Sequence, residues 1–381
     1  MMTTFTQHWQ QLQWDDVGMR IHSQTAADVE RALAADNPGP EEMMALLSPA
    51  ALAYLEPLAQ RAQRLTRRRF GNTINFYLPL YLSNLCANDC TYCGFSMSNR
   101  IRRKTLNEQE ILSECRAIRA KGIDNVLLVT GEHKSKVGID YFRRYVPLVR
   151  QAFSSLMMEV QPLSQAEYAE LKGLGLDGVL VYQETYHPPT YRRHHLRGQK
   201  QDFVWRLETP DRLARAGIDK IGLGALIGLS DNWRADCYMV AQHLLYMRHT
   251  YWQSRYSLSF PRLRPCAGGV TPASLMDEAQ LLQVMCAFRL LAPAVEISLS
   301  TRESAHFRDH AVPIVVNSVS AGSKTQPGGY ASDRPELEQF LPHDNRSPQE
   351  VAQVLTRAGL QPVWKDWDPY LGRVSVAADG A

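Results

Sequence analysis

Three cysteines in one short loop are the residues whose types and spacing point most directly to chemistry. Cys86, Cys90 and Cys93 form a C-x3-C-x2-C pattern directly after an apolar run at residues 73–82. Three thiols this close cannot all point into a core, and they are poorly spaced for disulfides with one another. They can converge on one soft metal centre. Three cysteines leave one iron of a four-iron cluster without a cysteine ligand, so a substrate or cofactor could bind there.

The composition is that of an ordinary soluble globular enzyme. The chain has 381 residues, 45% apolar and 21% charged, with a formal net charge of +3. This near-neutral balance gives no support to a nucleic-acid or membrane partner, and no run reaches the roughly 20 apolar residues of a membrane span. The N-terminus lacks the basic-then-apolar order of a secretory signal. Seven cysteines, three of them clustered, argue against a disulfide framework, so we expect a cytoplasmic protein.

Short apolar runs that alternate with helical segments must position the cysteine loop. Most of the runs are nearly continuous, as in parallel strands that are covered on both faces. They predict eight strands, at residues 73–82, 125–130, 155–161, 177–183, 218–226, 256–262, 294–300 and 312–319.

Helix start and stop signals separate these strands. Capping boxes at Thr105–Glu108 and Ser164–Glu167 predict helix starts, as does a proline that follows Thr209 or Thr271. Three helices are predicted to end in a Gly-apolar-Asp sequence before a strand, where glycine permits a left-handed cap, at Gly122, Gly175 and Gly217.

Eight strands with intervening helices predict an α/β fold, a (β/α)8 TIM-type barrel, with a doubly wound open sheet as the alternative. We expect three parts: an N-terminal helical extension (1–70), the barrel (71–330), and a C-terminal helix and tail (331–381) packed on the barrel. The extension should hold helices at 26–35, 41–47 and 49–68, with Trp9 and Trp14 as packing anchors. In the last part, Ser347 should cap a helix, and residues 361–368 should pack back on the body.

Polar side chains gather where the predicted strands end. Site residues of a TIM-type barrel lie at the carboxyl ends of its strands, and the cysteine loop follows the first strand, so it should share that face. The polar residues at these ends are Glu132, His133, Glu159, Gln161, Gln183, Glu184, Thr185, Arg262, Arg264, Arg302, Glu303, Ser318 and Ser320.

The cysteine pattern, with an aromatic residue before its last cysteine, resembles that of the radical S-adenosylmethionine superfamily. Other stretches are similar to the 2-iminoacetate synthases, the tyrosine lyases of thiamine biosynthesis. They lie between about residue 65 and Trp367 and read LLVTGEH, MEVQPL, VYQETYH, IGLGALIGLSDNWR, SFPRLRPC, LSTRE and SKTQPGGY. The resemblance implies a barrel of the radical S-adenosylmethionine class with two cofactors, a [4Fe–4S] cluster and S-adenosylmethionine.

The resemblance also assigns roles to residues of the cysteine loop and its neighbour. Cys86, Cys90 and Cys93 would bind three irons, and the methionyl part of S-adenosylmethionine would chelate the fourth. Tyr92 would lie near the adenine, and Glu132 would accept hydrogen bonds from the methionyl ammonium, which suits an acceptor-only carboxylate.

Further residues are implied around S-adenosylmethionine. Arg206 would bind its carboxylate, for which a planar guanidinium is the natural partner. Gln183 or Thr185 would contact the ribose, Ile227 would flank the adenine, and Gln161 would lie near the ribose or the substrate.

The resemblance implies L-tyrosine as substrate. Arg302 matches an arginine that related aromatic amino-acid lyases use for the substrate carboxylate, and Ser320 or Ser318 could add a hydroxyl bond. The Cα–Cβ bond would break after a 5′-deoxyadenosyl radical takes a hydrogen from the amine, giving 2-iminoacetate and p-cresol. Expected partners are a thiazole synthase, which receives the hydrolysable imine, and a reductant of the flavodoxin or ferredoxin type.

Four alternatives stay open from the sequence. A structural zinc site would need a histidine as fourth ligand, and the nearest downstream, His133, lies beyond the usual spacing. A tyrosine-cleaving hydrogenase maturase carries a C-terminal extension with a second cysteine cluster, but this chain has no cysteine after Cys286. A tryptophan lyase would share the barrel. A non-catalytic iron–sulfur electron-transfer protein would leave Arg206 and the LSTRE stretch unexplained.

Overall fold

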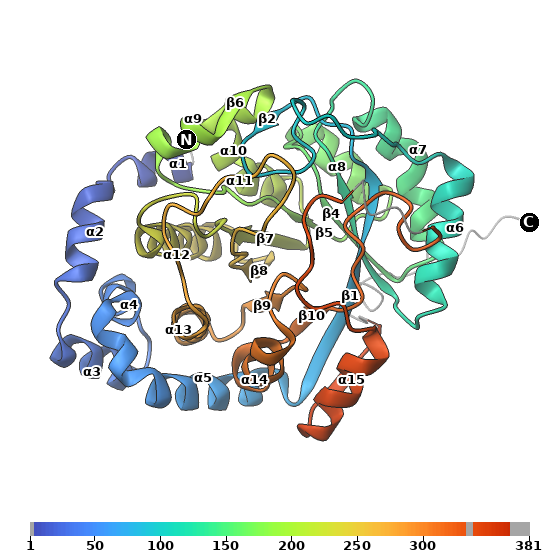
Figure 1. The fold of residues 1–381 in the computed structure, drawn as a ribbon. Coiled ribbons are helices and arrows are strands. Elements are labelled where there is room, and N and C mark those ends of the chain that lie inside the picture. Colours follow the sequence, from blue (N-terminus) through green and yellow to red (C-terminus); the bar gives the residue numbers. More distant parts are fainter. Residues whose placement is uncertain (1–3, 333–337, 366–381) are drawn as a thin grey trace, which may run out of the picture.

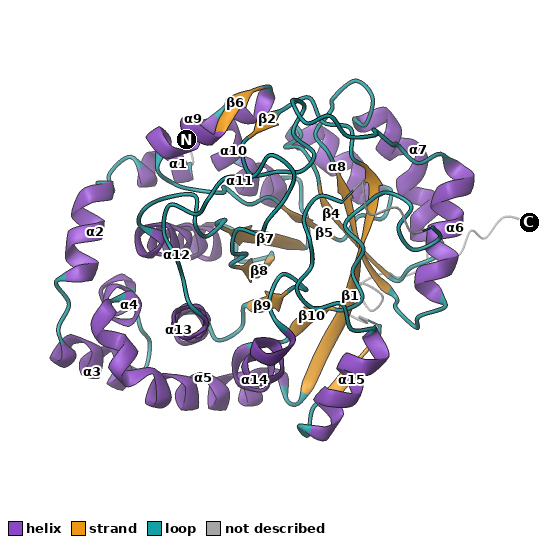
Figure 2. Ribbon diagram, viewed as in Figure 1, coloured by secondary structure: helices purple, strands orange, loops and turns teal. Residues whose placement is uncertain are grey.

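A closed barrel forms the body of the molecule. The computed structural model describes residues 4–332 and 338–365. Within them, eight parallel strands pair in sequence and the last pairs back with the first, so that Asn75 lies opposite Ser318 (Figure 2). The strands are β1 (Thr73–Ser83), β3 (Asn125–Thr130), β4 (Ser155–Glu159), β5 (Gly178–Leu180), β7 (Lys220–Gly224), β8 (Arg255–Ser259), β9 (Glu296–Leu299) and β10 (Ser318–Ser320). The predicted (β/α)8 TIM-type barrel is therefore confirmed, and the open-sheet alternative is wrong.

Helices connect the strands and cover the outside of the barrel. They are α6 (Glu108–Arg119), α7 (Ile139–Arg150), α8 (Gln165–Gly173), α11 (Thr209–Arg215), α12 (Trp233–Thr250), α13 (Glu278–Leu291) and α14 (Ala305–Val315). The capping box at Ser164 is confirmed, since its hydroxyl accepts from the Glu167 amide at 3.3 Å. Gly122, Gly175 and Gly217 have φ of 84°, 104° and 76°, the left-handed conformation that the Gly-apolar-Asp pattern predicts.

Three local predictions are wrong. The first half of the apolar run at 312–319 is the end of α14, and only residues 318–320 form the last strand, because a short apolar run does not distinguish a buried helix from a strand. Helix α6 is capped by Asn107 rather than Thr105, and α13 is capped by Asp277, six residues beyond Thr271. In both cases the side chain of the observed cap accepts a hydrogen bond from a free backbone amide of the first helical turn, that of Glu110 in α6 and that of Gln280 in α13.

An N-terminal group of helices packs along one side of the barrel (Figure 1). It comprises α1 (Phe5–Trp9), α2 (Trp14–His22), α3 (Ala26–Ala34), α4 (Pro40–Leu47), η1 (Pro49–Tyr54) and α5 (Leu55–Phe70). The helix predicted at 49–68 is thus a 3₁₀ segment followed by an α-helix. Both tryptophans pack as predicted, since Trp9 contacts Phe203 and Trp14 stacks on His187 with ring centroids 5.0 and 4.7 Å apart.

The C-terminal segment returns to the first strand. Helix α15 (Pro348–Arg357), capped by Ser347 as predicted, leads to β11 (Gln361–Val363), which pairs with β1 outside the closed barrel. Trp364 then packs on Phe76 at 4.7 Å. The prediction that 361–368 pack back is confirmed up to residue 365, and residues 366–368 lie outside the described part. The division at residues 70 and 330 stays a prediction. Across the described residues, we find no helix with the length and apolar character to cross a membrane.

Candidate active site

A cavity at the carboxyl ends of the strands brings the predicted site together. The cysteine loop forms one part of its lining, together with Glu132, Arg206 and the residues that follow β9 and β10. The loop is anchored by the short pair β2 (Asp89–Cys90) and β6 (His195–Arg197), in which Cys90 lies opposite His195. Chain segments from β1, β3, β9 and the connection after β5 therefore meet at one mouth.

The three cysteines are free thiols that all face this cavity. Protein N–H groups point at two of the sulfurs: for example, the Asn88 amide donates to Cys86 Sγ at 3.4 Å, and Gln339 Nε2 donates to Cys93 Sγ at 3.7 Å. Beside the loop, a Cβ on Gly131 would overlap the Leu85 carbonyl oxygen, so this position admits only glycine without displacement of the loop. The loop is thus held in place from two sides.

The donor set fits an iron–sulfur cluster better than a single metal ion. Burial raises the pKa of Cys86 to about 11 and raises the pKa values of Cys90 and Cys93 as well. Thiolates there need a bound cation, which deprotonates a coordinating thiol. Among the described residues no three histidine, cysteine or acidic side chains converge on one ion. A four-iron cluster does not require this because each sulfur binds its own iron, whereas the zinc alternative does.

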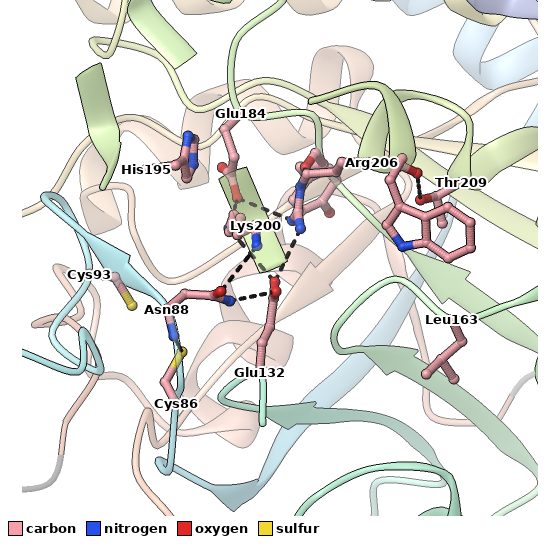
Figure 3. A network of polar contacts seen from close by, with 12 residues as sticks. Cys86, Asn88, Cys93, Glu132, Leu163, Glu184, His195, Lys200, Arg206 and Thr209 are labelled. Atoms are coloured by element: carbon pink, nitrogen blue, oxygen red, sulfur yellow. Dashed lines mark hydrogen bonds and ion pairs between the residues drawn. The ribbon is translucent and has the colours of Figure 1, made fainter. Parts of the chain in front are cut away.

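A buried network of four charges lies beside the cysteines (Figure 3). Arg206 Nη1 is 3.1 Å from Glu132 Oε1 and Arg206 Nη2 is 3.4 Å from Glu184 Oε1. Lys200 Nζ is 2.7 Å from Glu184 Oε1 and 3.9 Å from Glu132 Oε1. Asn88 links the network to the cysteine loop, because its Nδ2 donates to Glu132 Oε2 at 2.8 Å. Two cations balance two carboxylates, which is what burial of these groups requires.

Glu184 is held in an unusual backbone conformation within this network. Its φ of 71° makes it the one non-glycine residue of the described chain with a positive φ, a strained state that needs compensation from its surroundings. Burial alone would raise the pKa of Glu184, but Lys200 and Arg206 hold it below its ordinary value. The strain and the ion pairs together fix a carboxylate at the cavity wall.

Tyr92 also lines the cavity, and its hydroxyl is bonded to His195 Nε2 at 2.7 Å. Burial lowers the pKa of His195 to about 2, so that ring is neutral, and its Nδ1 donates to the Tyr191 carbonyl at 2.7 Å. Lys200 Nζ lies 5.6 Å from the centre of the Tyr92 ring. The orientation of Tyr92 is therefore fixed by a hydrogen bond at its hydroxyl and by a cation over the face of its ring.

Four other predicted residues lie outside the cavity lining. Gln161 and Gln183 are buried, and each keeps one side-chain oxygen without a hydrogen-bond partner in the described chain, an acceptor that a ribose hydroxyl could satisfy. Their contacts to S-adenosylmethionine stay predictions, as do those of Thr185 and Ile227. The structure places them as follows: Gln161 Nε2 donates to the Val137 carbonyl at 2.8 Å, Gln183 Nε2 to the Phe203 carbonyl at 3.4 Å, Thr185 Oγ1 to Asp236 Oδ1 at 3.0 Å, and the Ile227 amide to the Pro261 carbonyl at 2.8 Å.

The substrate side of the cavity holds Arg302 and Ser320. Arg302 stacks its guanidinium carbon 3.6 Å from the centre of the Phe340 ring, and no ion pair to it is present in the described residues. Ser318, the alternative to Ser320, is buried in β10 and does not line the cavity. A cation without a counter-ion can receive a substrate carboxylate.

Sequence reasoning missed several lining residues. Lys200 follows β6 in η2 (Gln199–Gln201), and no pattern connects that segment to a strand end. Gln339, whose Oε1 accepts from the Tyr81 hydroxyl at 2.8 Å, comes from the C-terminal part. Only Asn88 carried a signal, since it stands inside the cysteine loop.

Comparisons with known proteins agree with this geometry. The model of the Radical SAM superfamily matches residues 80–239, and that of the Biotin and Thiamin Synthesis associated domain matches residues 259–361. The 2-iminoacetate synthase of Salmonella typhimurium is 72% identical over 374 residues, which cover 98% of this chain and 99% of that protein. The Escherichia coli 2-iminoacetate synthase is 71% identical over the same shares. The chain belongs to the 2-iminoacetate synthase family.

Solved structures share the fold of this chain. The crystal structure of HydG, a maturase of the [FeFe]-hydrogenase, has a TM-score of 0.87 and 28% identity, and covers 94% of this chain and 81% of its own. Methylornithine synthase, at 22% identity and a TM-score of 0.70, shares the fold.

As a 2-iminoacetate synthase family member, the chain is a radical S-adenosylmethionine lyase that uses a [4Fe–4S] cluster and S-adenosylmethionine. The non-catalytic electron-transfer alternative is therefore wrong.

Proposed function

We propose that this enzyme cleaves the Cα–Cβ bond of L-tyrosine into 2-iminoacetate and p-cresol, for the thiazole of thiamine. The observation that carries the proposal is one cavity onto which three free cysteines, the Glu132–Arg206 pair and Arg302, which has no ion pair among the described residues, all open. When bound, the cluster and S-adenosylmethionine supply a 5′-deoxyadenosyl radical, along with methionine. The protein positions S-adenosylmethionine and tyrosine relative to each other and excludes water from the cavity.

The residues around the cysteines hold the cofactors. Cys86, Cys90 and Cys93 bind three irons. Glu132 receives the methionyl ammonium, and Arg206 receives the methionyl carboxylate. Their contact at 3.1 Å supports these roles, because it places one anion and one cation side by side, as the two charged ends of an amino acid require. Tyr92 flanks the adenine.

More distant residues complete the S-adenosylmethionine site in this proposal. Gln183 or Thr185 meets the ribose, Gln161 lies near the ribose or substrate, and Ile227 flanks the adenine. The unpartnered oxygens of the two glutamines support the ribose contacts.

On the opposite side of the cavity, Arg302 binds the tyrosine carboxylate and Ser320 adds a hydroxyl bond. Arg302 suits this role because its guanidinium is stacked on Phe340 and forms no ion pair within residues 4–332 and 338–365. The cavity thus has two separate cationic groups: Arg206 for the carboxylate of S-adenosylmethionine and Arg302 for the carboxylate of tyrosine.

A basic surface around the cysteine loop supports an acidic, flavodoxin- or ferredoxin-type reductant. Three segments are hydrogen-bonded to one another here: the cysteine loop, the loop after β3, and β6 with the helix before it. The Ala87 amide of the cysteine loop donates to the Glu132 carbonyl at 2.8 Å, and β2 of the same loop pairs with β6. From residue 86 to 104 Asp89 is the single acidic residue. Although the whole chain carries only +3, these segments expose seven cations: Arg100, Arg102, Lys134, Lys136, Arg192, Arg193 and Arg197. Complementary charge steers such an encounter.

The product predicts the other partner. Because 2-iminoacetate hydrolyses in water, the enzyme passes it directly to a thiazole synthase in the cytoplasm.

One anaerobic assay tests the proposal. Cluster-reconstituted enzyme is incubated with S-adenosylmethionine, dithionite and L-tyrosine, and 5′-deoxyadenosine, p-cresol and glyoxylate (the hydrolysis product of 2-iminoacetate) are quantified. We expect them in equal amounts. L-Tryptophan in place of tyrosine should give none, and products from tryptophan alone would establish a tryptophan lyase instead.

A further inference from the structure

Three carboxylates line the cavity, and one of them differs from the other two. Glu132 and Glu184 are bound to Arg206 and Lys200. The side chain of Glu159, the last residue of β4, has neither a hydrogen bond nor an ion pair in the described part of the chain, although it faces the same cavity. Glu159 is half-buried at the cavity wall, and a partly dehydrated carboxylate without a partner is stabilised by a ligand that supplies one.

The surroundings of Glu159 are mixed in charge. Charged groups act on it from several elements, Glu184 against its ionised form and Arg302, Lys200 and Arg206 in favour of it. Its other titratable neighbours are tyrosines from β1 and from the end of β5: Tyr77, Tyr81 and Tyr182. Burial, followed by Glu184, raises the pKa of Glu159 to about 7. It is therefore poised to gain or lose a proton near neutral pH.

The reaction needs a proton acceptor at the substrate nitrogen. Tyrosine arrives as a zwitterion, and removal of a hydrogen atom from its nitrogen is easier from a neutral amine than from an ammonium, which would leave a cationic radical. Of the cavity's carboxylates, Glu132 and Glu184 already hold cations. The tyrosines are no alternative, because burial raises their pKa values.

We propose that Glu159 binds the α-ammonium of the substrate tyrosine and accepts one proton from it, while Arg302 holds the carboxylate. One N–H bond breaks and one O–H bond forms on Glu159. The electron pair of the N–H bond stays on nitrogen, so nothing is oxidised or reduced in this step. The inference rests on the proposed tyrosine lyase function and makes Glu159 a catalytic residue in addition to Arg302 and Ser320.

Ligand binding tests this without turnover. Calorimetric titrations at pH 8 use cluster-loaded enzyme with S-adenosylmethionine and no reductant, comparing wild type with Glu159→Gln. The ligands are L-tyrosine, L-phenylalanine, which lacks the phenol hydroxyl, and 3-(4-hydroxyphenyl)propionate, which lacks the amine. We expect Glu159→Gln to weaken both amino acids about 10- to 100-fold and to leave the propionate unchanged. For wild type, tyrosine affinity should fall as pH drops below about 7, and the variant should lack this dependence.

The controls separate the outcomes. Glu114→Gln changes a buried carboxylate outside the cavity lining, which accepts hydrogen bonds from the backbone amides of Tyr330 and Ala331, and should alter none of the three affinities. If Glu159→Gln weakens tyrosine and the propionate but not phenylalanine, Glu159 reads the phenol and the proposal is overturned. Equal affinities in wild type and variant also overturn it. A missing p-cresol signal in the turnover assay would instead refute the lyase function, since these titrations involve no turnover.

Discussion

Replacement of Lys200 by methionine should destabilise the folded enzyme because it leaves a buried carboxylate short of a cation. The Lys200 and Glu184 side chains are only 10% and 13% exposed, and their charged atoms are 2.7 Å apart. With Lys200 absent, Arg206 alone must balance Glu132 and Glu184, so the network carries one uncompensated negative charge. Removal of one member of a buried pair costs about 3–5 kcal/mol.

The chain offers a matched control in Lys172→Met. Lys172 is 2.8 Å from Asp219, a similar distance, but the two side chains are 35% and 53% exposed. Water screens such a pair, and its loss costs about 0–1 kcal/mol. Lys172→Met also removes a hydrogen bond from Lys172 Nζ to the Gly217 carbonyl, so its measured cost is an upper bound on the loss of the exposed pair.

Urea unfolding of cluster-loaded protein under anaerobic conditions measures both variants. A double variant, Lys200→Met with Glu184→Gln, removes the orphaned charge and should recover about 2 kcal/mol relative to the sum of the single losses. If Lys200→Met costs no more than Lys172→Met, or if the double variant recovers nothing, the four-charge network does not stabilise the fold as argued.

Three further substitutions test the cysteine loop and the arginine proposed to bind the substrate carboxylate. Cys90→Ala should abolish the visible absorbance of the cluster and all 5′-deoxyadenosine formation, and retention of both would remove Cys90 from the ligand set. Arg302→Lys keeps the charge but loses the planar fork, so KM for tyrosine should rise about tenfold with cluster absorbance intact; loss of the cluster instead would contradict its substrate role. Gly131→Ala should lower iron content because its Cβ overlaps the Leu85 carbonyl, whereas Gly173→Ala, with open space around its Cβ, should bind iron normally.

Much of the architecture could be predicted from sequence because it is encoded locally. Continuous apolar runs and left-handed glycines such as Gly122 located seven of the eight strands, and the cysteine spacing located the cluster loop. The last strand was misplaced since residues 312–316 have no periodicity that separates helix from strand. The resemblance brought Glu132 and Arg206 to the site, and the structure places them in contact.

What sequence reasoning did not find depends on tertiary arrangement. Lys200 sits in a one-turn segment that reaches the cavity only because β6 pairs with β2. The state of the Glu159 side chain is likewise invisible in the sequence, which gives its strand-end position but not the lack of an ion pair to it among the described residues.

The pairing of β1 sets the order in which the protein can fold. This strand carries the cysteine loop at its end, yet two of its three partners are β10 and β11, which begin at residues 318 and 361. A ribosome that makes the chain from its N-terminus completes the cysteines long before those partners exist, and contacts so distant in sequence form slowly. The barrel therefore cannot close around the cysteine loop until residues 318–320 have been made, so the thiols lie outside a finished barrel during most of synthesis.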